Sequence, residues 1–317
     1  MPAQLGMQGR VSFGEEVTAG TEVARTLTMR IASTTLQGKV TRDAVANLYG
    51  SGGTAANAAD FFDVSKDVAG EISGPACYQG GALGMLLKHA MGAVSTAGTN
   101  PYNHTFTLSG ALPAGLTTVV ERGTGGLGDQ EFYGCKVSSL ELSCQVGQVM
   151  QVRVNLLGLD CGARGGDTPP AVTSPYFIKH NHAGSLGFNS STYTIKSFRL
   201  MVENSLEAIR ELGSLPATEI NRSDFQTIEM EVELVARSDA PYAAMLAGTQ
   251  GDATITFSDG TRSLAVTVHN AVITEYDDPI NGPGTITQRI KFLGLGDGTD
   301  HGLGIVLTNG VSTAVGG

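Results

Sequence analysis

Leu157-Gly158-Leu159-Asp160 closes the first half of the chain, and Leu293-Gly294-Leu295 closes the second half 136 residues later. An alternating strand pattern precedes each stretch, with Val152, Val154 and Leu156 in the first half and Ile286, Ile290 and Phe292 in the second. Two more pairs of similar segments occur in the same order, 105–109 with 254–258 and 82–86 with 242–246. Internal repetition changes the whole fold prediction. The ordered matches predict two related domains, spanning 1–165 and 166–317.

The composition suits compact domains that are rich in turns. The 317 residues are enough for about two domains. Apolar residues make up 41% of the chain, and glycines number 43, roughly twice the usual ~7%. The glycines show no Gly-X-Y period, so collagen is excluded and turns between short strands are favoured. The net charge of −10, without a basic patch, argues against tight binding of nucleic acid.

The cysteines and the apolar runs bear on the compartment. Cys77, Cys135, Cys144 and Cys161 form no Cys-x-x-Cys pair and are too few for a disulfide framework, so we expect reduced, mostly buried side chains. The first residues lack a basic segment followed by an apolar run, and no apolar stretch approaches the ~20 residues of a membrane helix. The sequence predicts neither a signal peptide nor a membrane span, and synthesis in a cytoplasm.

Strands and turns dominate the predicted secondary structure. Apolar residues at helical spacing predict one short helix in each half, over 80–92 and 239–247. Period-two alternation predicts strands through most of the remainder, most clearly over 228–234. We also expect a linker at 162–176, a connection with helical character at 203–213, and a Gly- and Thr-rich arm from Gly296 onward. The fold class is mainly β.

One long connection, 41–63, interrupts the strand pattern. Its middle, Ser51-Gly52-Gly53-Thr54-Ala55-Ala56-Asn57, is predicted as a flexible tip, and Phe61-Phe62 follows it. Loops this long inside compact domains are usually functional or disordered.

Motifs for cofactors and metals are weak in this sequence. Residues 123–128 match Gly-x-Gly-x-x-Gly by letter, but loop and strand are predicted after them in place of the helix that a dinucleotide site needs. His180 and His182 could share a strand face and chelate a metal, yet no third ligand lies nearby in the sequence. A turn is favoured over an acid pair at 277–278, and a loop over a cation site at 297–301. We therefore predict no enzyme, no metal site and no cofactor.

A row of acids stands out in the strand over 228–234. Glu229, Glu231 and Glu233 face one way, and the apolar residues between them face the other. One interpretation is a solvated sheet face. The other is the acidic wall of a channel, because aligned like charges repel one another and so suggest a use.

Three passages of the first half carry a resemblance. They are the strand–helix run 70–92, the run 100–122 with Asn100-Pro101-Tyr102-Asn103-His104 and Leu112-Pro113-Ala114-Gly115, and the strand start 134–142. Together they resemble the tail tube (major tail) proteins of bacteriophages with long, non-contractile tails. The passages are patterns of elements and include no catalytic signature. The second half joins the resemblance through the internal repeat.

The resemblance implies two tandem tail-tube β-sandwich domains, each with one short flanking helix, whose sheets join into a β-barrel ring. Duplicated members would form trimeric rings with pseudo-sixfold symmetry, which stack into a hollow tube that conducts DNA into the host. The connection 41–63 sits where the family has its inter-ring loop, so we assign Tyr49, Phe61 and Phe62 to stacking. The acids predicted to line the lumen and repel DNA are Asp67, Glu71, Glu229, Glu231 and Glu233.

The implied partners are further copies of the chain, the tape measure protein, the tail terminator and the baseplate or tip proteins. Genomic DNA would pass without specific binding, and no membrane is involved. The protein would be made in the host bacterial cytoplasm and end in the virion tail.

Two alternatives stay open. The first is the tube subunit of a contractile tail or a secretion machine, against which the tandem domains argue, since those tubes generally use single-domain subunits. The second is a monomeric β-sandwich binding module or β-rich hydrolase, against which the lack of a convergent polar cluster in the sequence argues.

Overall fold

Strands make up most of this protein. The computed structural model describes residues 9–44, 61–123, 128–165, 168–171, 174–280, 282–298 and 301–313. Within these ranges the α-helices are α1 (Leu83–Met91) and α2 (Ala240–Leu246), one in each half and at the predicted places. None of the helices described is long and apolar enough to cross a membrane. The mainly β fold class is confirmed.

The strands of the first half are β1 (Arg10–Glu15), β2 (Leu27–Arg30), β3 (Ser33–Thr34), β4 (Gln37–Ala44), β5 (Phe61–Pro75), β6 (Cys77–Gln79), β7 (Gly92–Ala97), β8 (Tyr102–Leu108), β9 (Leu116–Glu121), β10 (Gln130–Gln145), β11 (Gln151–Gly158) and β12 (Asp160–Cys161). Those of the second half are β13 (Tyr176–Phe177), β14 (Leu186–Phe188), β15 (Ser191–Tyr193), β16 (Ile195–Glu203), β17 (Leu206–Ile209), β18 (Glu219–Arg222), β19 (Thr227–Val235), β20 (Gln250–Ser258), β21 (Ser263–Asp277), β22 (Thr287–Leu293) and β23 (Leu303–Asn309). A 3-10 turn, His180–His182, follows β13.

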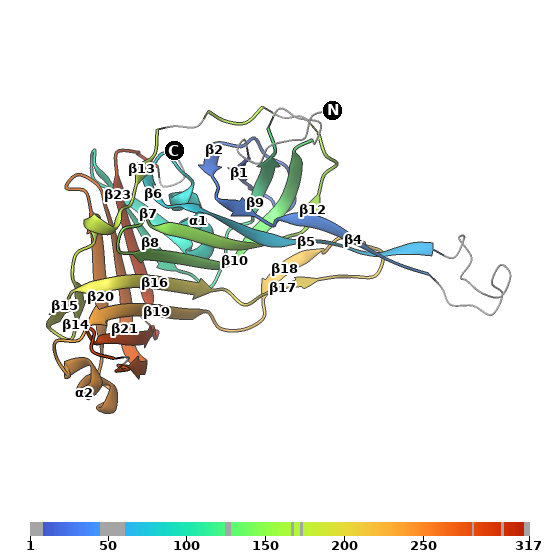
Figure 1. Ribbon diagram of the computed structural model, residues 1–317. Coiled ribbons are helices and arrows are strands. Elements are labelled where there is room, and N and C mark those ends of the chain that lie inside the picture. Colours follow the sequence, from blue (N-terminus) through green and yellow to red (C-terminus); the bar gives the residue numbers. More distant parts are fainter. Residues whose placement is uncertain are drawn as a thin grey trace.

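One antiparallel sheet, which we call the shared sheet, runs through both halves. Its order is β4–β5–β11–β10–β16–β19–β22–β21, and the two halves meet where β10 pairs with β16. The short strand β3 continues the line of β4 along β5. Figure 1 shows the β4–β5 hairpin projecting away from the body of the molecule. In the part of the chain that the structure describes, neither β4 nor the end of β21 has a further strand beside it, so both edges of the shared sheet are free.

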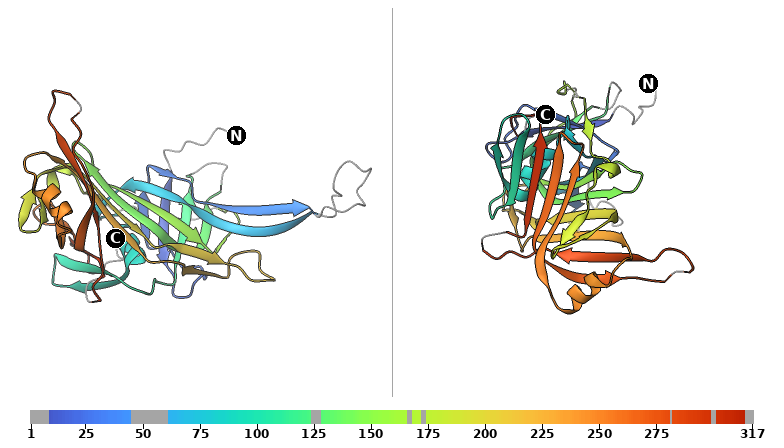
Figure 2. Two further views of the ribbon diagram at one scale, coloured as in Figure 1. Left: turned by 90° about the horizontal axis from the view of Figure 1, so that it is seen from below. Right: turned by 90° about the vertical axis from the view of Figure 1, so that its left-hand side faces the viewer.

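The long strands β10 and β21 connect the shared sheet to a second layer. The first part of β10 pairs with β9 and β12, and β1 and β2 continue beyond β9. The first part of β21 pairs with β20 and β23. Beyond them lie β14 and β15 on one side and β8 and β7 on the other, as the right-hand view of Figure 2 shows. The apolar core fills the space between the layers and includes Phe13, Phe132, Phe198, Phe257 and Phe292.

The same set of strand pairings occurs in both halves. In the first half it is β1–β2, β1–β9, β9–β10, β10–β11, β10–β12, β11–β5 and β5–β4. In the second half it is β14–β15, β14–β20, β20–β21, β21–β22, β21–β23, β22–β19 and β19–β16. Each helix follows the corresponding strand, α1 after β5 and α2 after β19. This recurrence supports the predicted duplication, while the boundary between 165 and 166 stays a prediction.

The recurrence extends to a β-bulge in each long strand. The register of β10 against β11 shifts at Ser138, and that of β21 against β22 shifts at Thr274. At each bulge the hydroxyl donates a hydrogen bond to a carbonyl of the partner strand, from Ser138 to Asn155 at 3.1 Å and from Thr274 to Lys291 at 3.3 Å. Both pairs are related by the same 136 residues that separate the two Leu-Gly-Leu stretches.

The pairings also show where the halves differ. The counterpart of β20 is β9, so the sequence match between 105–109 and 254–258 does not join equivalent strands. Residues 105–108 lie in β8, which forms a hairpin with β7 and pairs with β23 of the other half. The second half carries the β17–β18 hairpin, so the helical character predicted at 203–213 is wrong. These insertions interlock the halves.

Two segments predicted as irregular contain strands. Both ends of 41–63 are paired, because β4 continues to Ala44 and β5 begins at Phe61, while 45–60 lie outside the described residues. The tail is not simply an arm, since Leu303–Asn309 form β23 between β21 and β8. Buried Leu303, Ile305 and Leu307 drive that pairing, and their alternation is masked in the sequence by the surrounding glycines and threonines.

Candidate functional site: the charged face of the shared sheet

The two histidines with metal-ligand spacing do not form a metal site. His180 and His182 lie in the 3-10 turn and not on a strand face. The described residues contain no group of three or more side chains suited to hold a metal ion. His182 instead contacts Tyr78, whose hydroxyl lies 3.2 Å from the His182 Nδ1. The Gly-rich segment at 123–128 leads from β9 into the strand β10, which does not provide the helix that a dinucleotide site requires.

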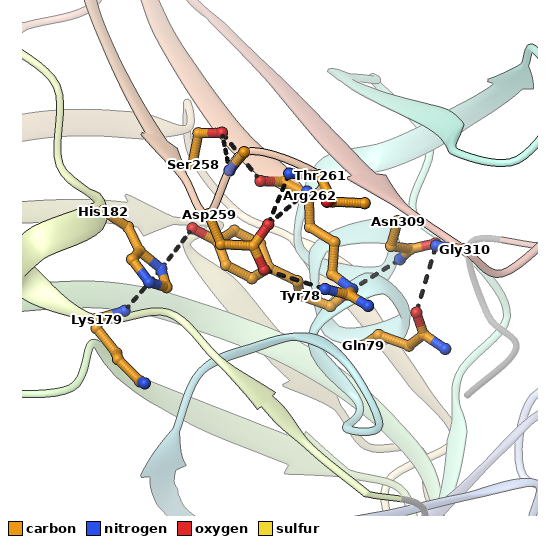
Figure 3. Close-up of polar contacts among 11 residues, drawn as sticks. Tyr78, Gln79, Lys179, His182, Ser258, Asp259, Thr261, Arg262, Asn309 and Gly310 are labelled. Carbon is orange, nitrogen blue, oxygen red and sulfur yellow. Dashed lines mark hydrogen bonds and ion pairs between the residues drawn. The ribbon is translucent and has the colours of Figure 1, made fainter.

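The polar cluster around Tyr78 joins the halves (Figure 3). The Tyr78 backbone carbonyl accepts a hydrogen bond from Asn309 Nδ2 at 2.9 Å, and burial raises the pKa of its phenol. Asp259 closes the turn between β20 and β21 by accepting the backbone N–H of Arg262 at 2.7 Å. The Arg262 guanidinium lies 3.5 Å from the centre of the Tyr176 ring. Each of these groups fastens one segment to another, so the cluster acts as a structural joint.

The shared sheet carries a second, larger polar surface on the face turned away from the core. The strand alternation explains this arrangement, because the intervening residues Val68, Ile72, Ile228, Met230, Val232 and Leu234 are buried. The predicted acids Asp67, Glu71, Glu229, Glu231 and Glu233 therefore lie on this one face. We call this surface the charged face.

Each of the five acids contacts a cation from a neighbouring segment. On the first half Asp67 pairs with Arg210, and Glu71 lies 3.5 Å from Arg153. On the second half the pairs are Glu229 with Lys291 at 2.9 Å, Glu231 with Arg289, and Glu233 with Lys196 at 3.1 Å. The charged face is thus a network of both signs and not a continuous acidic wall.

Arg199 on β16 connects the two halves of this network. Its guanidinium donates to Glu141 on β10 at 2.7 Å, and it lies 3.8 Å from Glu231 on β19. The hydrogen bond to Glu141 raises the pKa of Arg199. In the same way, the hydrogen bond to Glu229 raises the pKa of Lys291. These cations therefore keep their charge at all ordinary pH values.

The cations of the charged face are what the sequence reading missed. The signal was present, because Arg289 and Lys291 alternate with buried Ile290 and Phe292 in the same way as the glutamates of β19 alternate with apolar residues. Their partners could be identified once the pairing of β19 with β22 was known.

The residues assigned to ring stacking lie at the far end of the β4–β5 hairpin. Phe61 and Phe62 start β5 and are 57% and 47% exposed, which is high for phenylalanine. The guanidinium of Arg42 on β4 lies 5.9 Å from the centre of the Phe61 ring. Tyr49 lies outside the described residues. The described tip is therefore an exposed aromatic end on a projecting hairpin.

Comparison with known proteins agrees with this architecture. No curated protein matches the chain. The family model described as phage tail tube protein matches residues 6–294, which is nearly the whole chain and includes both halves. A mainly β subunit with recurring strand pairings, whose sheet has two free edges among the described residues, fits a protein that assembles with copies of itself. The chain belongs to the phage tail tube protein family and is a structural component of the phage tail.

Proposed function

We propose that three copies of this chain form a ring with pseudo-sixfold symmetry, and that the rings stack into a hollow helical tube that conducts DNA into the host. The observation that carries the proposal is the construction of the shared sheet. Each half contributes four strands in the same order, β4–β5–β11–β10 and β16–β19–β22–β21, and within the described part of the chain the sheet ends in a free edge on both sides.

The junction inside the chain supports ring closure. Where β10 pairs with β16, the last strand of one half joins the first strand of the other. The end of β21 is the equivalent of β10, and β4 is the equivalent of β16. Neither has such a partner among the described residues. Repeating the internal junction between chains leaves no free edge, and three chains give a barrel of ~24 strands, wide enough for an open channel.

The β4–β5 hairpin supports stacking of the rings. It projects well beyond the body of the subunit (Figure 1), and its described end carries the exposed Phe61 and Phe62. Apolar side chains gain free energy when an adjacent ring covers them. We assign the inter-ring contact to this hairpin, with Tyr49 in the same segment of sequence. Tape measure, terminator and baseplate or tip proteins would then be the partners at the lumen and at the tube ends.

The charged face is the surface we assign to the lumen. The opposite face of the shared sheet is occupied by the core and α1, so it is not available to line a channel. On the charged face the cations are engaged by carboxylates, which lowers their availability to DNA phosphates. DNA then passes over the face without being held.

Electron microscopy of the purified protein tests the proposal. We expect rings with threefold symmetry and six similar lobes, and stacked tubes at higher protein concentration. Monomers at all concentrations, or hexameric rings of whole chains, would contradict the proposed assembly.

A further inference from the structure

We propose that the end of β21 in one subunit pairs with β4 of the next subunit in one defined antiparallel register. In this register Glu275 lies directly opposite Lys39 of the next subunit, Tyr276 lies opposite Gly38, and Asp277 lies opposite Gln37. The inference rests on the proposed ring and specifies which strands and which residues close it.

The junction inside the chain provides the template. There β10 pairs with β16, with Ser139 opposite Glu203 and Glu141 opposite Met201. The Asn204 N–H donates to the Ser138 carbonyl at 2.8 Å. Ser138 and Asn204 therefore form a hydrogen-bonded pair. Because hydrogen-bonded and non-hydrogen-bonded pairs alternate along antiparallel strands, the next pair, Ser139 and Glu203, is non-hydrogen-bonded, with Cα atoms about 4.5 Å apart.

The first strand of the template, β10, has its equivalent in β21. Each of them pairs with the strand that leads into a Leu-Gly-Leu stretch, β11 or β22, and each contains a bulge, at Ser138 or at Thr274. Ser139 lies opposite Asn155 just as Glu275 lies opposite Lys291. Glu275 therefore takes the place of Ser139.

The second strand of the template, β16, has its equivalent in β4. The equivalence of individual residues follows from the neighbouring strands β5 and β19. Ala69 on β5 lies opposite Leu157, and Glu229 on β19 lies opposite Leu293, so Ala69 and Glu229 are equivalent. Gln37 on β4 lies opposite Ala69, and Met201 on β16 lies opposite Glu229. Two residues further along each strand, the equivalent positions are Lys39 and Glu203.

Superposing these equivalences on the template places Glu275 against Lys39. The Glu275 side chain is 73% exposed in the single subunit, and Lys39 is exposed on β4. Opposite charges on directly opposed residues stabilise a strand pair. The internal junction has no such charge pair at this position, because Ser139 lies opposite Glu203. The charge pair thus marks the junction between chains. It favours joining β21 to β4 over joining β21 to a second β21, where Glu275 would meet carboxylates.

A cysteine pair tests the register. In a Cys161→Ser background, Lys39→Cys combined with Glu275→Cys should oxidise to a covalent trimer on a non-reducing gel, because opposed non-hydrogen-bonded positions suit a disulfide. The matched control is Gln37→Cys with Glu275→Cys, which are diagonal and ~7–8 Å apart between Cα atoms. We expect little cross-linking in this control. Rings that cross-link through Gln37, or through neither pair, would overturn the register and leave the ring proposal standing. Wild-type protein without rings, and cysteine variants without cross-links, would overturn both.

Charge exchange gives a second test that does not depend on oxidation. Lys39→Glu should lower the fraction of protein in rings, and Lys39→Glu with Glu275→Lys should restore it. Circular dichroism of the dissociated subunits checks that each variant is folded. Equal loss of rings in the single and the exchanged variants of folded protein would contradict the pairing.

Discussion

Glu71 and Glu231 occupy equivalent positions in the two halves of the shared sheet. Each pairs with an arginine two residues along the neighbouring strand, Glu71 with Arg153 on β11 and Glu231 with Arg289 on β22. The two arginines are 136 residues apart, the same spacing as the bulges and the Leu-Gly-Leu stretches. The recurrence between the two halves therefore includes a charge pair on the exposed face as well as the buried pattern.

The first prediction compares these two pairs. Glu231→Gln should destabilise the subunit by roughly 0.2–1 kcal/mol, as is usual for exposed ion pairs. Glu71→Gln should cost less, because Glu71 has one cation near it and Glu231 has Arg289 and Arg199. Urea unfolding at low and at high salt measures both effects, and the difference should shrink at high salt. An equal cost for the two variants at low salt would show that Arg199 adds nothing to Glu231.

Local patterns predicted the elements that depend on neighbouring residues in the chain. The helix over 80–92 appears as α1 because Leu83, Leu86 and Leu87 are buried in the core, and Gly92 ends it with φ of 98°. The alternation over 228–234 appears as β19 for the same local reason. Both signals are contained within a few residues.

Features that depend on distant pairing could not be predicted. Nothing in residues 102–108 indicates that β8 pairs with β23, some 200 residues further along the chain. In the sequence the acids of β19 form a row without partners, because their cations come from β16 and β22. The sign of a surface depends on strand order, which a single strand's alternation does not contain.

A second prediction uses two leucines that match in the sequence comparison of 82–86 with 242–246. Leu86 on α1 is 1% exposed, whereas Leu246, the last residue of α2, is 68% exposed. Leu86→Ala should lower the free energy of unfolding by about 2–5 kcal/mol, and Leu246→Ala should change it by no more than about 0.5 kcal/mol. Thermal or urea unfolding of the dissociated subunit measures both. Comparable losses would mean that α2 is covered in the free subunit.

A third prediction concerns acid stability. The His89 Nε2, 3.5 Å from the Glu15 carboxylate, and the contact with Lys88 lower the pKa of Glu15 from its ordinary value near 4.5 to about 2. Since the folded-state pKa lies below the unfolded value, the stabilisation is present above pH 4.5 and is lost as the pH falls towards 2. Glu15→Gln should therefore be less stable than wild type at pH 6, with the difference vanishing near pH 2.

The control for this prediction is Glu211→Gln, an exposed carboxylate outside the helix contact. It should leave the free energy of unfolding at pH 6 within about 0.5 kcal/mol of wild type. Burial lowers the pKa of His89, so its ring stays neutral in the folded chain and takes up a proton on unfolding. Wild type should therefore also lose stability as the pH falls below the ordinary histidine value of 6.5, and the measurement that bears on Glu15 is the difference between wild type and Glu15→Gln. A wild-type and Glu15→Gln difference that persists at pH 2 would contradict the assignment.

A fourth prediction tests the stacking hairpin. Phe61→Ser with Phe62→Ser should leave the subunit folded and able to form rings, because both side chains are exposed. Tubes should become short or absent, since the apolar contact to the next ring is lost. Val64→Ser on the same strand, where Val64 is 46% exposed, is the matched control. Deleting 48–60 should give the same ring-only outcome. Normal tube lengths from the double serine variant would refute the role of the aromatic pair.

The last prediction concerns passage of DNA over the charged face. Glu229, Glu231 and Glu233 neutralise Lys291, Arg289 and Lys196 respectively. Replacing the three acids by glutamine removes those partners and turns the face towards positive, so DNA phosphates should adhere to it. Phage carrying the variant should form tubes of normal length but release DNA several-fold more slowly at low salt. The defect should shrink at high salt, where screening weakens the attraction.

The matched control removes the same charge elsewhere, through Glu207→Gln, Glu211→Gln and Glu219→Gln in and near the β17–β18 hairpin. If the lumen assignment is right, this control releases DNA at the wild-type rate, because none of these three glutamates is among the acids of the charged face. Equal slowing in both variants would point to net charge as the cause. The assignment of the charged face to the channel would be refuted if phage carrying the triple glutamine variant released DNA at the wild-type rate. A tube structure with Glu231 on the outside would refute it as well.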